Sequence, residues 1–95
     1  MNGDPFQLPI DGTLDLHAFS PSEAKSLIRE YIDVCRAHGI LQLRIIHGKG
    51  TGTLRRIVHA SLARHPAVMA YRTGDESGGS WGATLVDLQP LPENI

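Results

Sequence analysis

The fold is decided by residues 41–53, which read Leu41-Gln42-Leu43-Arg44-Ile45-Ile46-His47-Gly48-Lys49-Gly50-Thr51-Gly52-Thr53. The apolar run from Leu41 to Ile46 predicts a strand, because a short and nearly continuous apolar run is typical of a well-buried strand. The glycines between Gly48 and Gly52 predict a turn, and a helix is expected to begin near Thr53. This succession of strand, turn and helix belongs to a β-α-β unit.

The segment before this stretch predicts another strand, from Gly12 to His17. Successive side chains of a strand point to opposite faces of the sheet. Leu14 and Leu16 therefore share one face, and Asp15 and His17 share the other. The apolar pair is expected to face the core.

A helix is predicted to start at Ser20-Pro21-Ser22-Glu23. Ser20 suits the N-cap, Pro21 suits the first helical position, and Glu23 completes a capping box. Apolar residues that recur every three or four positions form the buried stripe of this helix: Ala24, Leu27, Ile28, Tyr31, Ile32 and Cys35. Gly39 is the expected stop.

The rest of the chain completes an alternating order of elements. The second helix is expected to end at Pro66, and its inner face is expected to consist of Leu54, Ile57, Val58, Ser61 and Leu62. Strands are predicted over residues 68–71 and 83–88. The order β-α-β-α-β-β predicts an α/β (α+β) two-layer sandwich, in which two helices cover one face of a mixed four-stranded sheet. Right-handed crossovers make the first three strands parallel, and the last strand returns as a hairpin.

Length and composition indicate one small globular domain. The chain has 95 residues, of which 41% are hydrophobic, and no apolar run approaches the length of a membrane span. Residues 1–10 are expected to be a flexible N-terminal arm and residues 11–90 the folded domain. The start lacks the basic and apolar regions of a signal peptide, and Cys35 is the only cysteine. A monomeric, cytoplasmic protein with a reduced thiol is expected.

Basic residues gather in the middle of the sequence. Seven of the nine lie in a stretch that contains no Asp or Glu: Arg36, Arg44, Lys49, Arg55, Arg56, Arg64 and Arg72. The acidic residues all lie at or before Asp33 or at or after Asp75. This distribution suits an anionic partner, provided that the basic side chains form one patch rather than being scattered over solvated faces. The sequence leaves both arrangements open.

The predicted topology brings several polar segments to one edge of the sheet. The C-terminal ends of parallel strands meet at one edge, and ligands bind there in open α/β sheets. The turn from Gly48 to Gly52 can present backbone N–H groups to an anion at the start of a helix, and Lys49 adds a full charge. Phosphate is the expected ligand. The turn matches neither a P-loop nor a Rossmann fingerprint, and a plain tight turn is the alternative.

Asp15, His17 and His47 are the candidates for acid–base chemistry at this edge. Asp15 and His17 leave the open, solvent-facing side of a two-layer fold, where the aspartate can orient the histidine. The alternative is that Asp15 and His17 are a structural pair on a solvent-exposed surface with no catalytic role. Trp81 is expected either to stack on a base or to cover the end of the core. The other histidines are expected at the surface near helix ends: His38, His59 and His65.

Three motifs taken together resemble those of the Smr (small MutS-related) domain. They are Leu14-Asp15-Leu16-His17, then His47-Gly48-Lys49-Gly50-Thr51-Gly52 with Leu54-Arg55, then Gly79-Ser80-Trp81-Gly82-Ala83-Thr84-Leu85-Val86. The match runs from about Gly12 to Leu88, and the chain looks like a stand-alone member of the family. One departure is Ala18, where the first motif commonly has glycine. The family fold is similar to the C-terminal domain of bacterial translation initiation factor three, which agrees with the order of elements above.

The resemblance implies a nucleic-acid-binding endonuclease, with Asp15, His17 and His47 as catalytic residues. The residues expected to contact the DNA or RNA backbone are Gly48, Lys49, Gly50, Thr51, Gly52, Arg55, Gly79 and Gly82. A two-metal nuclease needs several carboxylates, and the motifs contain only Asp15. A histidine-led mechanism is therefore expected, in which His17 or His47 serves as base and acid, Asp15 orients, and Lys49 holds the phosphate with the turn.

The remaining alternatives concern substrate, metal and function class. RNA is favoured by mechanism, because its 2′-hydroxyl is a built-in nucleophile, whereas the usual activity of the family favours DNA. No cofactor is assigned, and a divalent Mg or Mn ion stays open. A non-catalytic nucleic-acid-binding module and a protein-interaction domain are the other functions that the sequence allows.

Overall fold

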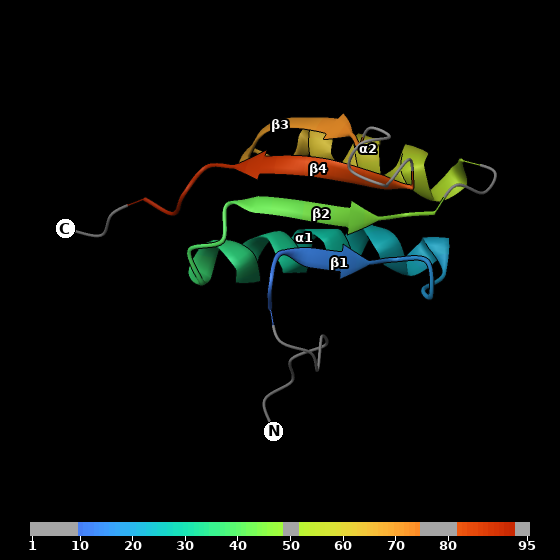
Figure 1. The fold of residues 1–95 in the computed structure, drawn as a ribbon, viewed down its shortest axis with the longest axis horizontal. Helices are drawn as coiled ribbons and strands as arrows, with labels where there is room; N and C mark the ends of the chain where they lie inside the picture. Colours follow the sequence, from blue (N-terminus) through green and yellow to red (C-terminus); the bar gives the residue numbers. More distant parts are fainter. Residues whose placement is uncertain (1–9, 49–51, 75–81, 93–95) are drawn as a thin grey trace, which may run out of the picture.

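The computed structural model describes residues 10–48, 52–74 and 82–92, and it has the predicted order of elements (Figure 1). The elements are β1 (Thr13–Asp15), α1 (Pro21–Ala37), β2 (Gln42–Ile46), α2 (Thr53–Arg64), β3 (Val68–Thr73) and β4 (Ala83–Leu88). The four strands form one sheet, and Figure 1 shows both helices behind it. The two-layer prediction is confirmed, because both helices of the described residues lie on the same side of the sheet.

The strand order is β1-β2-β4-β3. β1 pairs with β2 in parallel, whereas β4 is antiparallel to both of its neighbours. β1, β2 and β3 therefore run in the same direction and β4 returns, as predicted. The insertion of β4 between β2 and β3 is a feature that the alternation of elements did not specify. As a result, the ends of β1, β2 and β3 meet the start of β4 at one edge, which we call the carboxyl edge.

The core fills the space between the sheet and the helices. Its buried members come from both helices, from β1, β2 and β4 and from the adjoining turns: Leu14, Leu16, Ala24, Ile28, Tyr31, Ile32, Cys35, Leu43, Ile45, Val58, Leu62, Ala67, Val86 and Leu88. β3 contributes the partly buried Val68 and Tyr71, which pack against this core. The predicted stripes of both helices thus face the sheet. Within the described residues, no helix is both long enough and apolar enough to cross a bilayer.

Tyr31 fixes α1 to the start of β1. Its hydroxyl accepts a hydrogen bond from the Gly12 N–H and donates one to the Thr13 carbonyl oxygen, each at 3.0 Å. Burial raises the pKa of Tyr31 to about 12, so the phenol remains protonated and can donate at neutral pH. The core stripe of the helix and the first strand are therefore joined by directional bonds as well as by apolar packing.

Local sequence signals set the ends of the helices and of β1. The capping box predicted for α1 is present, with the Glu23 carboxylate accepting the Ser20 N–H at 3.0 Å. α2 begins after Gly52, whose φ of 91° suits glycine. β1 is shorter than the predicted strand, because the Asp15 carboxylate accepts the N–H of His17 at 3.0 Å and turns the chain there.

Candidate active site

The carboxyl edge brings together segments from all three motifs. Asp15 is paired with Ile46 in the sheet register, so His17 and His47 follow two neighbouring strand ends. The Gly82 carbonyl oxygen accepts hydrogen bonds from the N–H groups of His47 at 2.7 Å and Gly48 at 2.9 Å. The convergence predicted from the parallel topology is therefore present in the described parts of the motifs.

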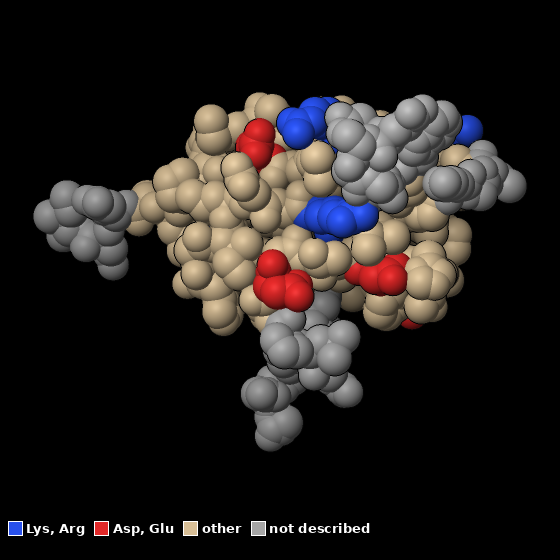
Figure 2. Space-filling view, viewed as in Figure 1, with Lys and Arg blue, Asp and Glu red and all other residues tan. Residues whose placement is uncertain are grey.

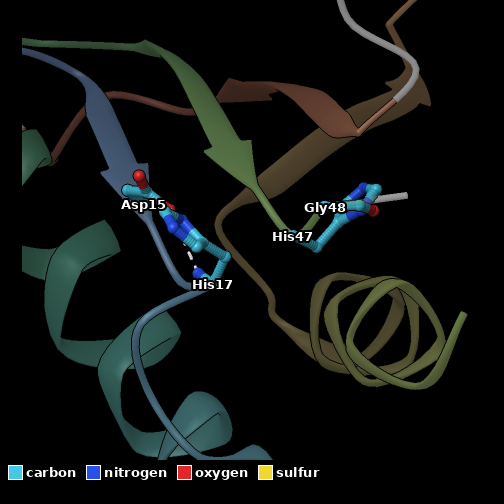
Figure 3. Close-up of polar contacts among 4 residues, drawn as sticks. All are labelled: Asp15, His17, His47 and Gly48. Atoms are coloured by element: carbon cyan, nitrogen blue, oxygen red, sulfur yellow. Dashed lines mark hydrogen bonds and ion pairs between the residues drawn. The ribbon is translucent and has the colours of Figure 1, made fainter. Parts of the chain in front are cut away.

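Asp15 and His17 form a hydrogen-bonded pair that is open to solvent (Figure 3). One carboxylate oxygen, Oδ1, lies 2.5 Å from Nδ1 of His17 and also accepts its backbone N–H. The two side chains are 47% and 65% exposed, respectively. Because an ionised carboxylate can only accept, it fixes the proton on Nδ1 and leaves the lone pair of a neutral ring on Nε2. Such a ring is oriented to take a proton from a bound substrate.

His47 lies in a different environment, although it ends the adjacent strand. It is only 4% exposed, because it continues the inward alternation of Leu43 and Ile45 on the helix-facing side of β2. Nδ1 lies 3.0 Å from the Gly48 carbonyl oxygen, and Nε2 lies 2.9 Å from the Thr84 hydroxyl oxygen. In Figure 3 the His47 side chain extends away from His17. Both ring nitrogens of His47 therefore form hydrogen bonds within the protein.

The same hydroxyl group reaches a second histidine. Nε2 of His59 lies 2.9 Å from Oγ1 of Thr84, and the His59 ring packs against Tyr71 with ring centroids 5.1 Å apart. Burial lowers the pKa of His59, with smaller contributions from His47 and Arg55. The expectation of a surface histidine near a helix end was wrong for His59. It lies in the middle of α2, which packs its inner side onto β4.

Thr84 was absent from the predicted site and is completely buried. A signal for it exists in the sequence, because Thr84 alternates with Val86 and Leu88 on the inward face of β4. A hydroxyl in that register must find partners inside the protein. His47 and His59 are those partners.

A cleft of about 340 Å³ lies beside the turn that follows β2. We call it the turn cleft, and its lining residues are Pro21, His47, Gly48, Gly52, Thr53, Leu54 and Arg55. Gly82 packs directly against the Gly48 backbone that lines this cleft, since a Cβ atom at Gly82 would lie 3.1 Å from Cα of Gly48. Only glycine allows this close approach without displacement of the turn. Four predicted contact residues lie outside the described residues: Lys49, Gly50, Thr51 and Gly79.

The arginines of the described residues are distributed over several surfaces. Arg36 donates to the carbonyl oxygens of Gln89 and Pro90 at 2.8 and 3.1 Å. The open face of the sheet carries both signs of charge (Figure 2), and one groove there contains Arg44 and Arg72 together with acidic side chains. In this part of the chain the scattered arrangement holds, rather than one basic patch. Among the same residues no group of three or more His, Cys, Asp or Glu is placed to hold a metal ion.

Comparison with known proteins gives a consistent result. The Smr domain family model matches residues 14–89. Endonuclease MutS2 of Halothermothrix orenii is 39% identical over 80 residues, which are 84% of this chain and 10% of that protein. Endonuclease MutS2 of Staphylococcus saprophyticus is 40% identical over 76 residues, or 80% of this chain and 10% of that protein. The chain spans about a tenth of the length of these relatives.

Two solved structures have the same fold. The Smr domain of Thermus thermophilus MutS2 superimposes with a TM-score of 0.79 at 32% identity, covering 84% of this chain and 100% of that chain. YdaL, a stand-alone small MutS-related protein from Escherichia coli, superimposes with a TM-score of 0.77 at 29% identity. That match covers 85% of this chain and 66% of YdaL.

Proposed function

We propose a function for this chain on the premise that it belongs to the Smr domain family. The proposed function is endonucleolytic cleavage of a nucleic-acid backbone that binds at the carboxyl edge. Relatives named Endonuclease MutS2 share this region of sequence, which supports a nuclease. The observation that carries the proposal is the solvent-open Asp15–His17 pair, because it holds an imidazole in the tautomer that a general base requires.

In the proposed reaction, Nε2 of His17 takes the proton of the attacking hydroxyl group. The attacking group is the ribose 2′-hydroxyl when the substrate is RNA and a water molecule when the substrate is DNA. Its oxygen forms a bond to phosphorus while the bond to the leaving oxygen breaks. His17 then returns the proton to the leaving oxygen, and the Asp15 carboxylate stabilises the imidazolium between the two steps.

The turn cleft would hold the phosphate group during this reaction. Gly48 and Gly52 line this cleft, and Gly52 immediately precedes α2, where backbone N–H groups and the helix dipole favour an anion. Arg55 adds charge at the same place, and Lys49, Gly50, Thr51 and Gly79 remain the predicted contacts from the sequence motifs. His47, whose ring nitrogens are both bonded inside the protein, is assigned to holding the turn in shape.

The proposal is tested by incubating the purified chain with supercoiled plasmid and with labelled RNA, each with and without EDTA. We expect wild-type protein to cut at least one of them and the His17→Ala variant to cut neither. The His38→Ala variant should remain active, because it removes an exposed histidine at the C-terminal end of α1. The EDTA arms separate a metal-free histidine mechanism from one that uses Mg²⁺ or Mn²⁺.

Two outcomes would contradict the proposal. Full activity of a well-folded His17→Ala protein would refute the assigned base. Binding of both nucleic acids by the wild-type chain without cleavage of either would leave the non-catalytic binding module as the function.

A further inference from the structure

A groove of about 490 Å³ lies along α2 on the side of β3. It is lined by Gly52, Arg55, Arg56, His59, Ala60, Ala63 and Tyr71. None of these residues is acidic, whereas the groove on the open sheet face includes Asp11 and Asp87. Within the described residues, neither Arg55 nor Arg56 forms a salt bridge. We call this hollow the α2–β3 groove.

The α2–β3 groove is continuous with the turn cleft. Gly52 and Arg55 line both hollows, so the two meet at the first turn of α2. Arg56 and His59 extend the lining from there along the helix. A nucleic-acid strand bound at the turn cleft can therefore continue into the groove. Along this path the described lining residues include Arg55 and Arg56 and no Asp or Glu.

We infer that the α2–β3 groove binds a second phosphate group of the same nucleic-acid strand, with Arg55, Arg56 and His59 as its ligands. This inference rests on the proposed function, because it needs a strand at the carboxyl edge. Arginine donors form charge-assisted hydrogen bonds with phosphate oxygens. The small side chains of Ala60 and Ala63 leave room for the backbone beside them.

The hydrogen bonds of Thr84 determine what His59 can offer to such a ligand. The Gly48 carbonyl oxygen only accepts, so Nδ1 of His47 carries a proton, and Nε2 of the neutral ring accepts the Thr84 O–H. The Thr84 oxygen must then accept the N–H of His59 at Nε2. In the neutral ring this leaves Nδ1 of His59 without a proton, and no described residue bonds to it.

A phosphate oxygen can bond to that nitrogen only if it gains a proton. Binding in the groove therefore takes up a proton on His59. Among the described residues, the charged and titratable groups around this ring are Arg55 and Arg56 on α2, Tyr71 on β3 and His47 at the end of β2. In the free protein the surroundings lower the pKa of His59, and a phosphate anion beside it would raise the pKa again. The affinity should accordingly be highest at low pH and fall as pH rises through the pKa of the bound form.

The first test measures charge at the groove with a short, fluorescein-labelled single-stranded RNA, in a His17→Ala background that prevents cleavage. Arg56→Ala should weaken binding about tenfold and flatten the dependence of log affinity on log salt by about one. Arg64→Ala removes the same charge from the other end of α2, where its neighbours include Asp33 across the helix pair, and should leave affinity unchanged. Equal losses in both variants, or none in Arg56→Ala, would overturn the inference.

The second test follows the proton. RNA affinity should fall with rising pH in the same background, and His59→Gln should remove most of that dependence while thermal melting confirms its fold. An unchanged pH dependence would overturn the role of His59. The two tests can refute the groove proposal and the nuclease proposal independently of each other. Cleavage by wild type with an unaffected Arg56→Ala refutes only the groove, whereas weakened binding by Arg56→Ala without wild-type cleavage refutes only the nuclease.

Discussion

The ends of β1 and β2 look alike in sequence but differ in structure. Each is followed at the carboxyl edge by a histidine that the motifs mark as functional. His17 follows Asp15 on the outward side and is exposed to solvent, whereas His47 follows Ile45 on the inward side, is buried, and has its ring near that of His59 on α2. The outward histidine keeps one ring nitrogen for a substrate. The inward one uses both nitrogens to join the turn to β4.

This difference shows that strand register separates a histidine that can act on substrate from one that supports the site. Residues two positions apart on a strand point to the same face of the sheet. The residue two positions before each histidine therefore predicts the face to which its ring points. Leu14 and Leu16 place His17 opposite the core, and Leu43 and Ile45 place His47 in it. The following predictions test this separation, from the largest expected effect to the smallest.

Asp15→Asn should reduce cleavage most, by about 10²–10⁴-fold, the usual contribution of an acid–base group. An asparagine amide can donate to Nδ1 of His17 and so move the ring proton to Nε2, which abolishes the base. The melting temperature should not change, because both side chains are exposed. Cleavage rates and melting of Asp15→Asn are to be compared with Asp33→Asn, an exposed carboxylate on α1. An active Asp15→Asn protein would show that the pair is only structural.

His47→Ala should act mainly on stability. It leaves the Thr84 hydroxyl without its acceptor and opens a cavity, which together should cost about 2–4 kcal/mol of unfolding free energy. For a domain of this size that corresponds to a fall in Tm of at least about 8 °C. Thermal melting alongside His17→Ala provides the comparison. Equal melting temperatures for the two variants would remove the distinction between the two strand ends.

Thr84→Val should have a smaller effect of the same kind, about 1–2 kcal/mol, because it keeps the shape and removes only the hydroxyl. Nε2 of both His47 and His59 would lose its partner. Thr84→Ser retains the hydroxyl and should recover part of the loss. Denaturant unfolding of the three proteins measures this. A valine variant as stable as wild type would contradict the stabilising role of the Thr84 hydroxyl.

The smallest expected effect is on pH dependence. The folded protein lowers the pKa of His59, so the unfolded chain binds the proton more readily. This contribution to stability is present above about pH 6.5, the ordinary histidine range, and is lost as pH falls toward the lowered value. Melting followed from neutral to mildly acidic pH should therefore decline less in His59→Gln than in wild type, with His38→Ala as control. A steeper decline in His59→Gln would contradict the direction of the shift.

Much of the fold could be predicted because its signals are local. The capping box at Ser20, the stripe through Tyr31 and the alternation around Asp15 each depend on residues a few positions apart. The position of β4 between β2 and β3 could not be predicted from the sequence. An order in which β3 pairs with β2 and β4 lies at the edge has the same local signals, and packing of the whole sheet decides between the two orders. The link from His47 through Thr84 to His59 depends on that position and was missed for the same reason.

The backbone bonds around Gly82 also have a use in protein engineering. The Gly74 N–H donates to the Ala83 carbonyl oxygen at 2.8 Å, and the Gly82 carbonyl oxygen accepts from His47 and Gly48. Gly74, which follows β3, and Gly82, which precedes β4, are thus held by backbone bonds to residues outside the range 75–81. A designer who varies the sequence between Gly74 and Gly82 could therefore keep these two residues as fixed attachment points, because their backbone bonds adjoin the pairing of β3 with β4.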